Sequence, residues 1–71
     1  MVNTKKLKGK IIEKGSSIGI LAEQIGINRS TLYRKLKGQC PLTINDADLI
    51  AMSLNLSSKE AHEIFFSQFV A

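Results

Sequence analysis

The side chains best suited to molecular recognition lie in one short segment, residues 29–37, where the spacing of apolar residues predicts a helix. With Leu32 and Leu36 turned toward a core, Arg34 lies on the opposite face. Arginine pairs bidentately with guanine, and hydroxyl groups serve several base edges in the major groove of DNA. The base-reading candidates are Arg29, Ser30, Thr31, Tyr33 and Arg34.

A second group of side chains suits phosphate better than base edges. The N-terminus of the preceding predicted helix, at Ser16 and Ser17, presents backbone N–H groups that favour an anion. Asn28 is expected to cap the reading helix first and to contact DNA second. The phosphate candidates are Ser16, Ser17, Asn28, Lys35 and Lys37.

Five short helices are expected to position these side chains. Helix caps and glycines predict helices at about residues 4–14, 18–25, 29–37 and 44–54, and a fifth that opens at Ser57. Thr43 with Asp46, and Ser57 with Glu60, fit capping boxes. The connections are short and no strand alternation is present, so the sequence predicts one compact all-α domain over residues 1–71.

The segment from about residue 17 to 38 has the physical features of a helix-turn-helix. Gly26 permits a tight turn between two helices, and the small Ala22 lets the second helix cross closely over the first. Leu21, Ile25 and Leu32 are expected to fill the angle between the two helices.

This segment resembles the helix-turn-helix of the Cro/λ-repressor-like (XRE-type) family of phage and bacterial regulators. The resemblance rests on Leu21-Ala22, Gly26-Ile27, Leu32, Leu36-Lys37-Gly38, the downstream residues 49–57 and a fifth helix after them. It implies a λ-repressor-like fold and a small Cro-type repressor that binds a double-stranded DNA operator, with no cofactor and no small-molecule substrate. The sequence departs from the family at Lys35, where many members carry an apolar residue, and Leu36 is expected to take over that packing.

The charge distribution agrees with a polyanionic partner. The net charge of the 71-residue chain is +4. Residues 1–40 hold nine lysine or arginine residues and two acids, a net charge of +7, whereas residues 41–71 have a net charge of −3. The basic half coincides with the predicted helix-turn-helix, which favours DNA as its partner.

The C-terminal helix carries more apolar residues than one narrow stripe needs. Two offset i, i+4 pairs, Phe65 with Phe69 and Phe66 with Val70, cover a wide face. Either these residues fold over the core, or they form a partner surface. Its candidates are Phe66, Phe69 and Val70, and two partners are open: a second copy, as a homodimer, or another repressor, which would make the protein an antirepressor or modulator.

Several other classes of function are not expected. One cysteine and one histidine cannot form a zinc cage within one chain. The sequence holds no Ser-His-Asp set, no glycine-rich phosphate loop and no histidine pair, so we expect neither an enzyme nor a metal site. No apolar run is long enough for a signal peptide or a membrane span, and the bacterial cytoplasm is the expected location.

Overall fold

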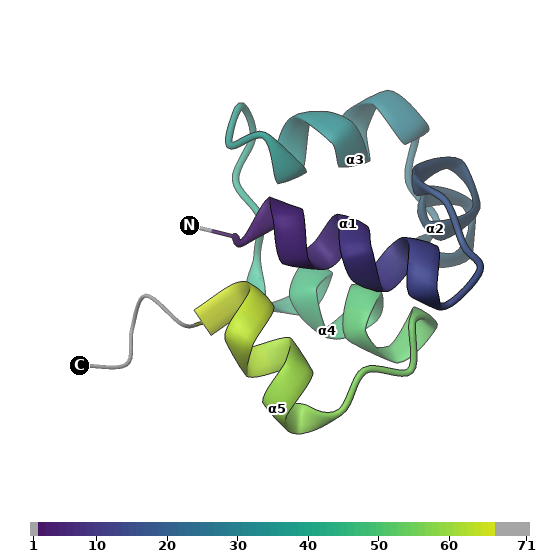
Figure 1. Ribbon diagram of the computed structural model, residues 1–71. Coiled ribbons are helices and arrows are strands. Elements are labelled where there is room, and N and C mark those ends of the chain that lie inside the picture. The colour runs from purple at the N-terminus through teal and green to yellow at the C-terminus, as the bar shows by residue number, and fades with distance from the viewer. Residues whose placement is uncertain (1, 67–71) are drawn as a thin grey trace.

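Five helices joined by short loops appear in the computed structural model, which describes residues 2–66 (Figure 1). They are α1 (Thr4–Glu13), α2 (Ile18–Ile25), α3 (Arg29–Leu36), α4 (Ile44–Ser53) and α5 (Ser58–Ala61), and α5 runs on into a π-helical turn, His62–Phe66. The described residues contain no strand. The predicted all-α, five-helix fold is confirmed, and the predicted helix boundaries agree with the observed ones to within one residue or two, apart from the π-helical turn.

Each helix begins where a polar side chain replaces a missing backbone partner. Asn3 and Ser17 accept hydrogen bonds from the backbone N–H groups of Lys6 and Ile20, each at 3.1 Å. α4 and α5 begin with the two predicted capping boxes, and both hydrogen bonds of each box are present. The starts of the helices are therefore set by local sequence.

The helix ends share one geometry. The turn after α2 has Gly26 in the left-handed region, at φ 79°, and the Ile27 N–H donates to the Ala22 carbonyl at 3.0 Å. Glycine adopts this conformation without the steric cost that a Cβ brings. Asn55 takes the same role after α4, at φ 53°, where its neighbour Leu56 donates to the carbonyl of Ala51 at 2.9 Å.

The core takes one large, fully buried side chain from each of five segments. These are Leu7 from α1, Leu21 from α2, Leu32 from α3, Ile50 from α4 and Ile64 from the π-helical turn. Full burial of one such side chain contributes about 1.5–3 kcal/mol of transfer free energy. Because every segment supplies one, the packing that stabilises the domain also fixes the position of α3.

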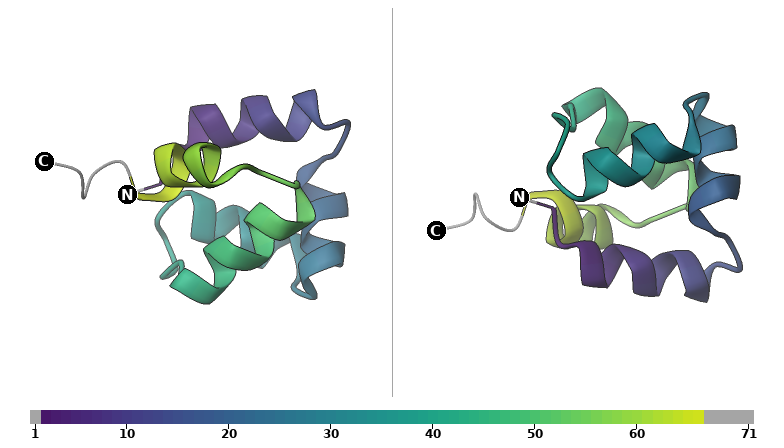
Figure 2. Two further views of the ribbon diagram at one scale, coloured as in Figure 1. Left: turned by 90° about the horizontal axis from the view of Figure 1, so that it is seen from below. Right: turned by 90° about the horizontal axis from the view of Figure 1, so that it is seen from above.

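α2 crosses the ends of the other long helices, as both views in Figure 2 show. The chain ends of the described part meet on the opposite side, where the Asn3 N–H donates to the Ile64 carbonyl at 2.8 Å. Ion pairs strengthen this closure, because Lys6 pairs with Glu63 and Lys10 pairs with Glu60. Lys10 first, and then the backbone N–H of Ser57, lower the pKa of Glu60 to about 2. Among residues 2–66, no helix has the length and apolarity needed to cross a bilayer.

Candidate nucleic-acid interface

The turn between α2 and α3 holds α3 across the surface of the domain. Ala22 is almost completely buried where the two helices meet, and Leu21 and Leu32 fill the angle between them. Ile25 and Ile27 are half-buried and pack against the same cluster. The predicted packing of this turn is confirmed, and it leaves one side of α3 free to face a partner.

The wheel prediction for α3 matches the observed burial. Leu32 and Leu36 are buried, and the Leu36 side chain takes the packing role expected of it. The exposed residues of this segment are Arg29, Ser30, Tyr33, Arg34 and Lys37, which we call the α3 face. Thr31 and Lys35 are half-buried and lie at its margins. The structure therefore brings four of the five base-reading candidates to one exposed surface.

Asn28 and Ser30 form a small hydrogen-bonded unit at the start of α3. The Asn28 Oδ1 atom accepts from the Ser30 backbone N–H at 2.9 Å and from the Ser30 hydroxyl at 2.7 Å. Asn28 is thus the predicted cap. Because the Ser30 hydroxyl donates its proton to Asn28, its lone pairs are what it offers to a ligand. Such an oxygen suits an amino group on a base edge.

The two arginines of the α3 face lie in different surroundings. The Arg29 side chain runs over the first turn of α2, because a Cβ built on Gly19 would lie 3.8 Å from Arg29 Cδ. The Arg34 Nε donates to the Ser30 carbonyl at 3.4 Å, which leaves its terminal nitrogen atoms for other partners. The Arg29 side chain therefore lies against both α2 and α3, whereas the hydrogen bond of Arg34 is to a residue of α3 itself.

Tyr33 belongs to a cationic cluster. The Lys37 Nζ atom lies 4.6 Å from the centre of the Tyr33 ring, a cation–π geometry. The Lys37 ammonium lowers the pKa of the Tyr33 phenol, and the charge of Lys8 on α1 adds a smaller contribution in the same direction. Lys8, an exposed residue of α1, therefore adds positive charge near this surface.

Lys35, a phosphate candidate, has a different environment from Lys37. Its Nζ atom donates to Asp46 Oδ2 at 2.9 Å and to the Pro41 carbonyl at 3.1 Å. In this geometry Lys35 holds the loop and α4 against α3 instead of presenting its charge to a ligand. The pKa of Asp46 is lowered, first by Lys35 and then by the backbone of Thr43.

A comparison with known protein families adds an independent observation. A family model described as the helix-turn-helix domain of resolvase matches residues 7–39, which run from α1 to the turn after α3. No curated protein and no solved structure matches the chain. The chain holds a helix-turn-helix DNA-binding domain. The match identifies the helix-turn-helix itself, without singling out the Cro-like branch.

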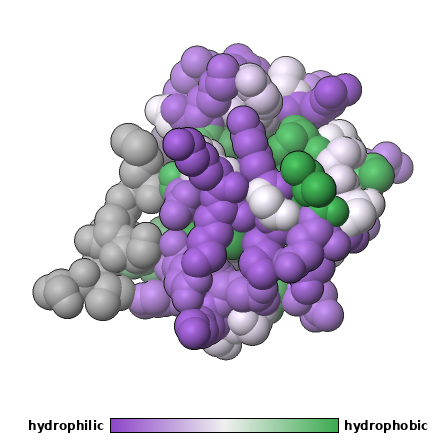
Figure 3. Space-filling view, in the orientation of Figure 1, coloured by the Kyte–Doolittle hydropathy of each residue, from purple (hydrophilic) through white to green (hydrophobic). Residues whose placement is uncertain are grey.

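The positive charges of the α3 face have no acidic partner among the described residues. Lys6, Lys10 and Lys35 are engaged in ion pairs with acids, most of them from the C-terminal half. Across residues 2–66, no ion pair engages Lys8, Lys37 or either arginine. Hydrophilic side chains cover much of α1 and α3 in Figure 3, and a hydrophobic area shows between them toward α2.

The two phosphate candidates at the start of α2 differ in exposure. Ser17 is exposed and is the N-cap, whereas Ser16 is half-buried and its hydroxyl lies 3.5 Å from the Ser17 carbonyl. Two residues outside the base-reading and phosphate candidates also contribute to this surface: Ile18 lines it, and Lys8, one of several first-helix lysines that could extend the phosphate contacts, adds its charge. Lys8 was one of five lysines in the N-terminal segment, and Ile18 has the spacing of a core residue, so neither carried a distinguishing signal.

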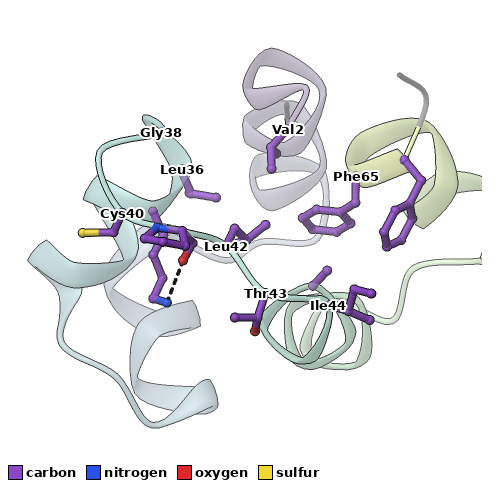
Figure 4. A pocket seen from close by; sticks show the side chains of 12 residues that line it. Val2, Leu36, Gly38, Cys40, Leu42, Thr43, Ile44 and Phe65 are labelled. Carbon is purple, nitrogen blue, oxygen red and sulfur yellow. Dashed lines mark hydrogen bonds between the residues drawn. The ribbon is translucent and has the colours of Figure 1, made fainter. Parts of the chain in front are cut away.

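The predicted partner surface corresponds in part to an apolar groove of about 560 Å³ between the end of α3, the start of α4 and the π-helical turn. Val2, Leu42, Ile44 and Phe65 turn toward it in Figure 4, where the dashed line is the hydrogen bond from Lys35 to the Pro41 carbonyl. The half-buried Phe66 lines the groove and packs on the core. Phe69 and Val70 lie outside the described residues. Within the described part, no group of three potential metal ligands is present.

Proposed function

We propose that the protein is a sequence-specific, double-stranded-DNA-binding regulator of transcription, a small phage repressor of the Cro type. It reads the major groove of an operator with α3 in the cytoplasm of a bacterial host. The observation that carries the proposal is the composition of the α3 face. Its five exposed side chains include two arginines, a serine and a lysine and no carboxylate. The family resemblance of the segment supports the Cro-type assignment.

Positioning and reading are assigned to different parts of the surface. Lys37, Lys8 and the first backbone N–H groups of α2, next to Ser17, suit the phosphates on either side of the groove, and such contacts fix register without reading sequence. Arg29 and Arg34 suit the acceptor atoms of guanine, and such bidentate contacts specify the site.

The test uses the duplex that the protein selects from a random pool, with affinity measured by fluorescence polarisation. Arg34→Ala is expected to weaken binding to that duplex by about tenfold and to reduce selectivity, because a bidentate base contact is worth about 1–3 kcal/mol. Arg34→Lys is the matched control: it keeps the charge, so it should lose selectivity but keep the salt dependence.

Two results would contradict the proposal at different levels. Unchanged affinity and selectivity in both Arg34 variants would show that α3 does not read bases through this residue. A failure of the wild-type protein to bind any duplex at low salt would reject DNA binding itself, since non-specific binding depends only on charge.

The apolar groove supports a second candidate function, an antirepressor or modulator that acts by binding another repressor through its C-terminal helix. Ile44 is 70% exposed at this groove, although it is a large apolar side chain. A homodimer formed there would serve the leading proposal instead, because paired half-sites require two recognition helices about 34 Å apart. Sedimentation of the purified protein distinguishes the two: self-association favours the operator-binding dimer, and a strict monomer favours a heterologous partner.

A further inference from the structure

The α3 face contains a hollow of about 550 Å³ that opens to solvent between α2 and α3. Its lining is Ile18, Asn28, Arg29, Ser30, Tyr33 and Arg34. Five of these six residues belong to the predicted DNA contacts, and the sixth, Ile18, is an apolar side chain at the start of α2. A surface that only neutralised phosphates would not need apolar side chains at this position.

Ile18 and the Tyr33 ring supply apolar surface to the hollow. Ile18 is half-buried, and Tyr33 is 45% exposed. Lys37 lies over the Tyr33 ring but does not line the hollow, so the ring presents another part of its surface to that space. A small apolar group that enters here would lose its water shell against Ile18 and Tyr33.

The polar atoms around the hollow have a defined character. Arg29 and Arg34 offer only donors. Ser30 offers lone pairs, because its hydroxyl proton is held by Asn28 at 2.7 Å. In the major groove, a T·A pair presents the thymine 5-methyl group, then the thymine O4 acceptor, and then the amino donor of adenine. One apolar space with a nearby acceptor therefore matches the edge of a T·A pair.

We propose that this hollow receives the 5-methyl group of a thymine in the major groove, so that Ile18 and Tyr33 select a T·A pair at one position of the operator. Ser30 accepts from the amino group of the paired adenine. The inference rests on the proposed DNA-binding function and assigns a specificity role to Ile18. 5-Methylcytosine carries the same methyl group, and it is distinguished from thymine by the experiment below.

The experiment replaces each thymine of the selected duplex, one at a time, with deoxyuridine. This change removes only the methyl group and keeps every hydrogen-bonding atom of the base. At one position of each bound site, we expect affinity to fall about fourfold, the value for one buried methyl-sized group. In a second arm, cytosine and 5-methylcytosine are compared at that position. 5-Methylcytosine should bind about fourfold better than cytosine but more weakly than thymine, because the adenine amino group is lost.

Protein variants connect the effect to the hollow. Ile18→Ala should bring the thymine-to-uracil ratio at that position close to one. Ile20→Ala is the matched control, because Ile20 is an exposed isoleucine of the same helix that does not line the hollow, and it should keep the ratio. Ile18 also packs against the core, so Ile18→Val provides a milder change, with an expected ratio of about two.

The outcomes separate this inference from the function on which it depends. If a duplex is selected but no thymine shows a deoxyuridine effect, the hollow does not read a methyl group, and the proposed function stands. The same conclusion follows if the effect persists in Ile18→Ala. If no duplex is bound at all, the proposed function itself is wrong.

Discussion

Two lysines at the end of α3 show how position decides the use of a charge. Lys35 and Lys37 are two residues apart, so they point to nearly opposite sides of the helix. The side chain of Lys35 is 18% exposed and pairs with Asp46, whereas Lys37 is exposed beside the Tyr33 ring. From residue type alone, both lysines are predicted to contact DNA phosphates. The structure gives Lys35 a role in stability, and this difference can be measured.

Replacement of Lys35 by methionine should lower the free energy of unfolding by about 1 kcal/mol at pH 7, at the upper end for a partly exposed ion pair. The Asp46 pKa is lowered in the folded state, so the stabilisation is fully present above its unfolded value of about 4 and is lost as the pH falls through the folded value. Urea unfolding should therefore show a difference between the two proteins at pH 7 that becomes smaller at pH 2.

Lys37→Met is the control for this prediction, because it removes the same charge from the exposed side of α3 and should change stability little. For DNA binding we expect the reverse order, since Lys37 is the phosphate candidate that remains free. An equal loss of stability at both pH values in Lys35→Met, or a large effect on DNA binding from Lys35→Met alone, would contradict this assignment.

At the scale of the helices, the beginnings and ends could be predicted because they depend on residues that are close together in the sequence. Capping side chains lie within three residues of the N–H groups that they satisfy, and the αL residues are three glycines and Asn55. Pairs between helices could not be predicted in this way. Lys35 and Asp46 are 11 residues apart, and Lys10 and Glu60 meet only after the whole chain has folded.

The π-helical turn was also outside the reach of local rules. The apolar residues around Ile64 and Phe65 fit an α-helical spacing closely enough that an ordinary helix was expected. The turn lies where the Ile64 carbonyl accepts from the Asn3 N–H at the other end of the described chain. The position of Ile18 at the hollow could not be predicted for a similar reason. An apolar residue with helical spacing indicates a core position, and how much of its side chain stays exposed depends on how α3 crosses α2.

Substitution of two glycines by alanine tests how backbone conformation alone affects the free energy of unfolding, at one position inside a helix and at one position after a helix end. A Cβ at Gly9, inside α1, or at Gly26, after α2, would meet no atom within 4 Å. Gly9→Ala should therefore raise the free energy of unfolding by about 0.5–1 kcal/mol through helix propensity. Gly26→Ala should lower it by about 1–2 kcal/mol, because alanine is strained at positive φ. Thermal and urea unfolding that moved both variants in one direction would contradict this argument.

For the whole molecule, the net charge of +4 is the sum of a basic N-terminal half and an acidic C-terminal half. Folding then pairs some of the lysines with these acids and leaves other cations of the described part unpaired. The acids of the C-terminal half do not simply offset the basic half. Glu60, Glu63 and Asp46 pair with lysines that are not members of the α3 face. The cations left without such a pair include Lys8, Lys37 and the two arginines. Within residues 2–66, folding therefore neutralises three lysines outside the α3 face and leaves the arginines and Lys37 of that face without an acidic partner.

This distribution of charges predicts that two exposed lysines with the same formal charge act differently on DNA. The charge of Lys8 on α1 acts on Tyr33 of α3, whereas the charge of Lys59 on α5 acts on Glu63. Each phosphate contact contributes about −0.9 to the slope of log Kobs against log salt. Lys8→Gln should reduce the magnitude of that slope by about 0.9, and Lys59→Gln should leave it unchanged, although each variant removes one positive charge. Equal changes in both variants would show that net charge governs binding and that α1 does not border the duplex.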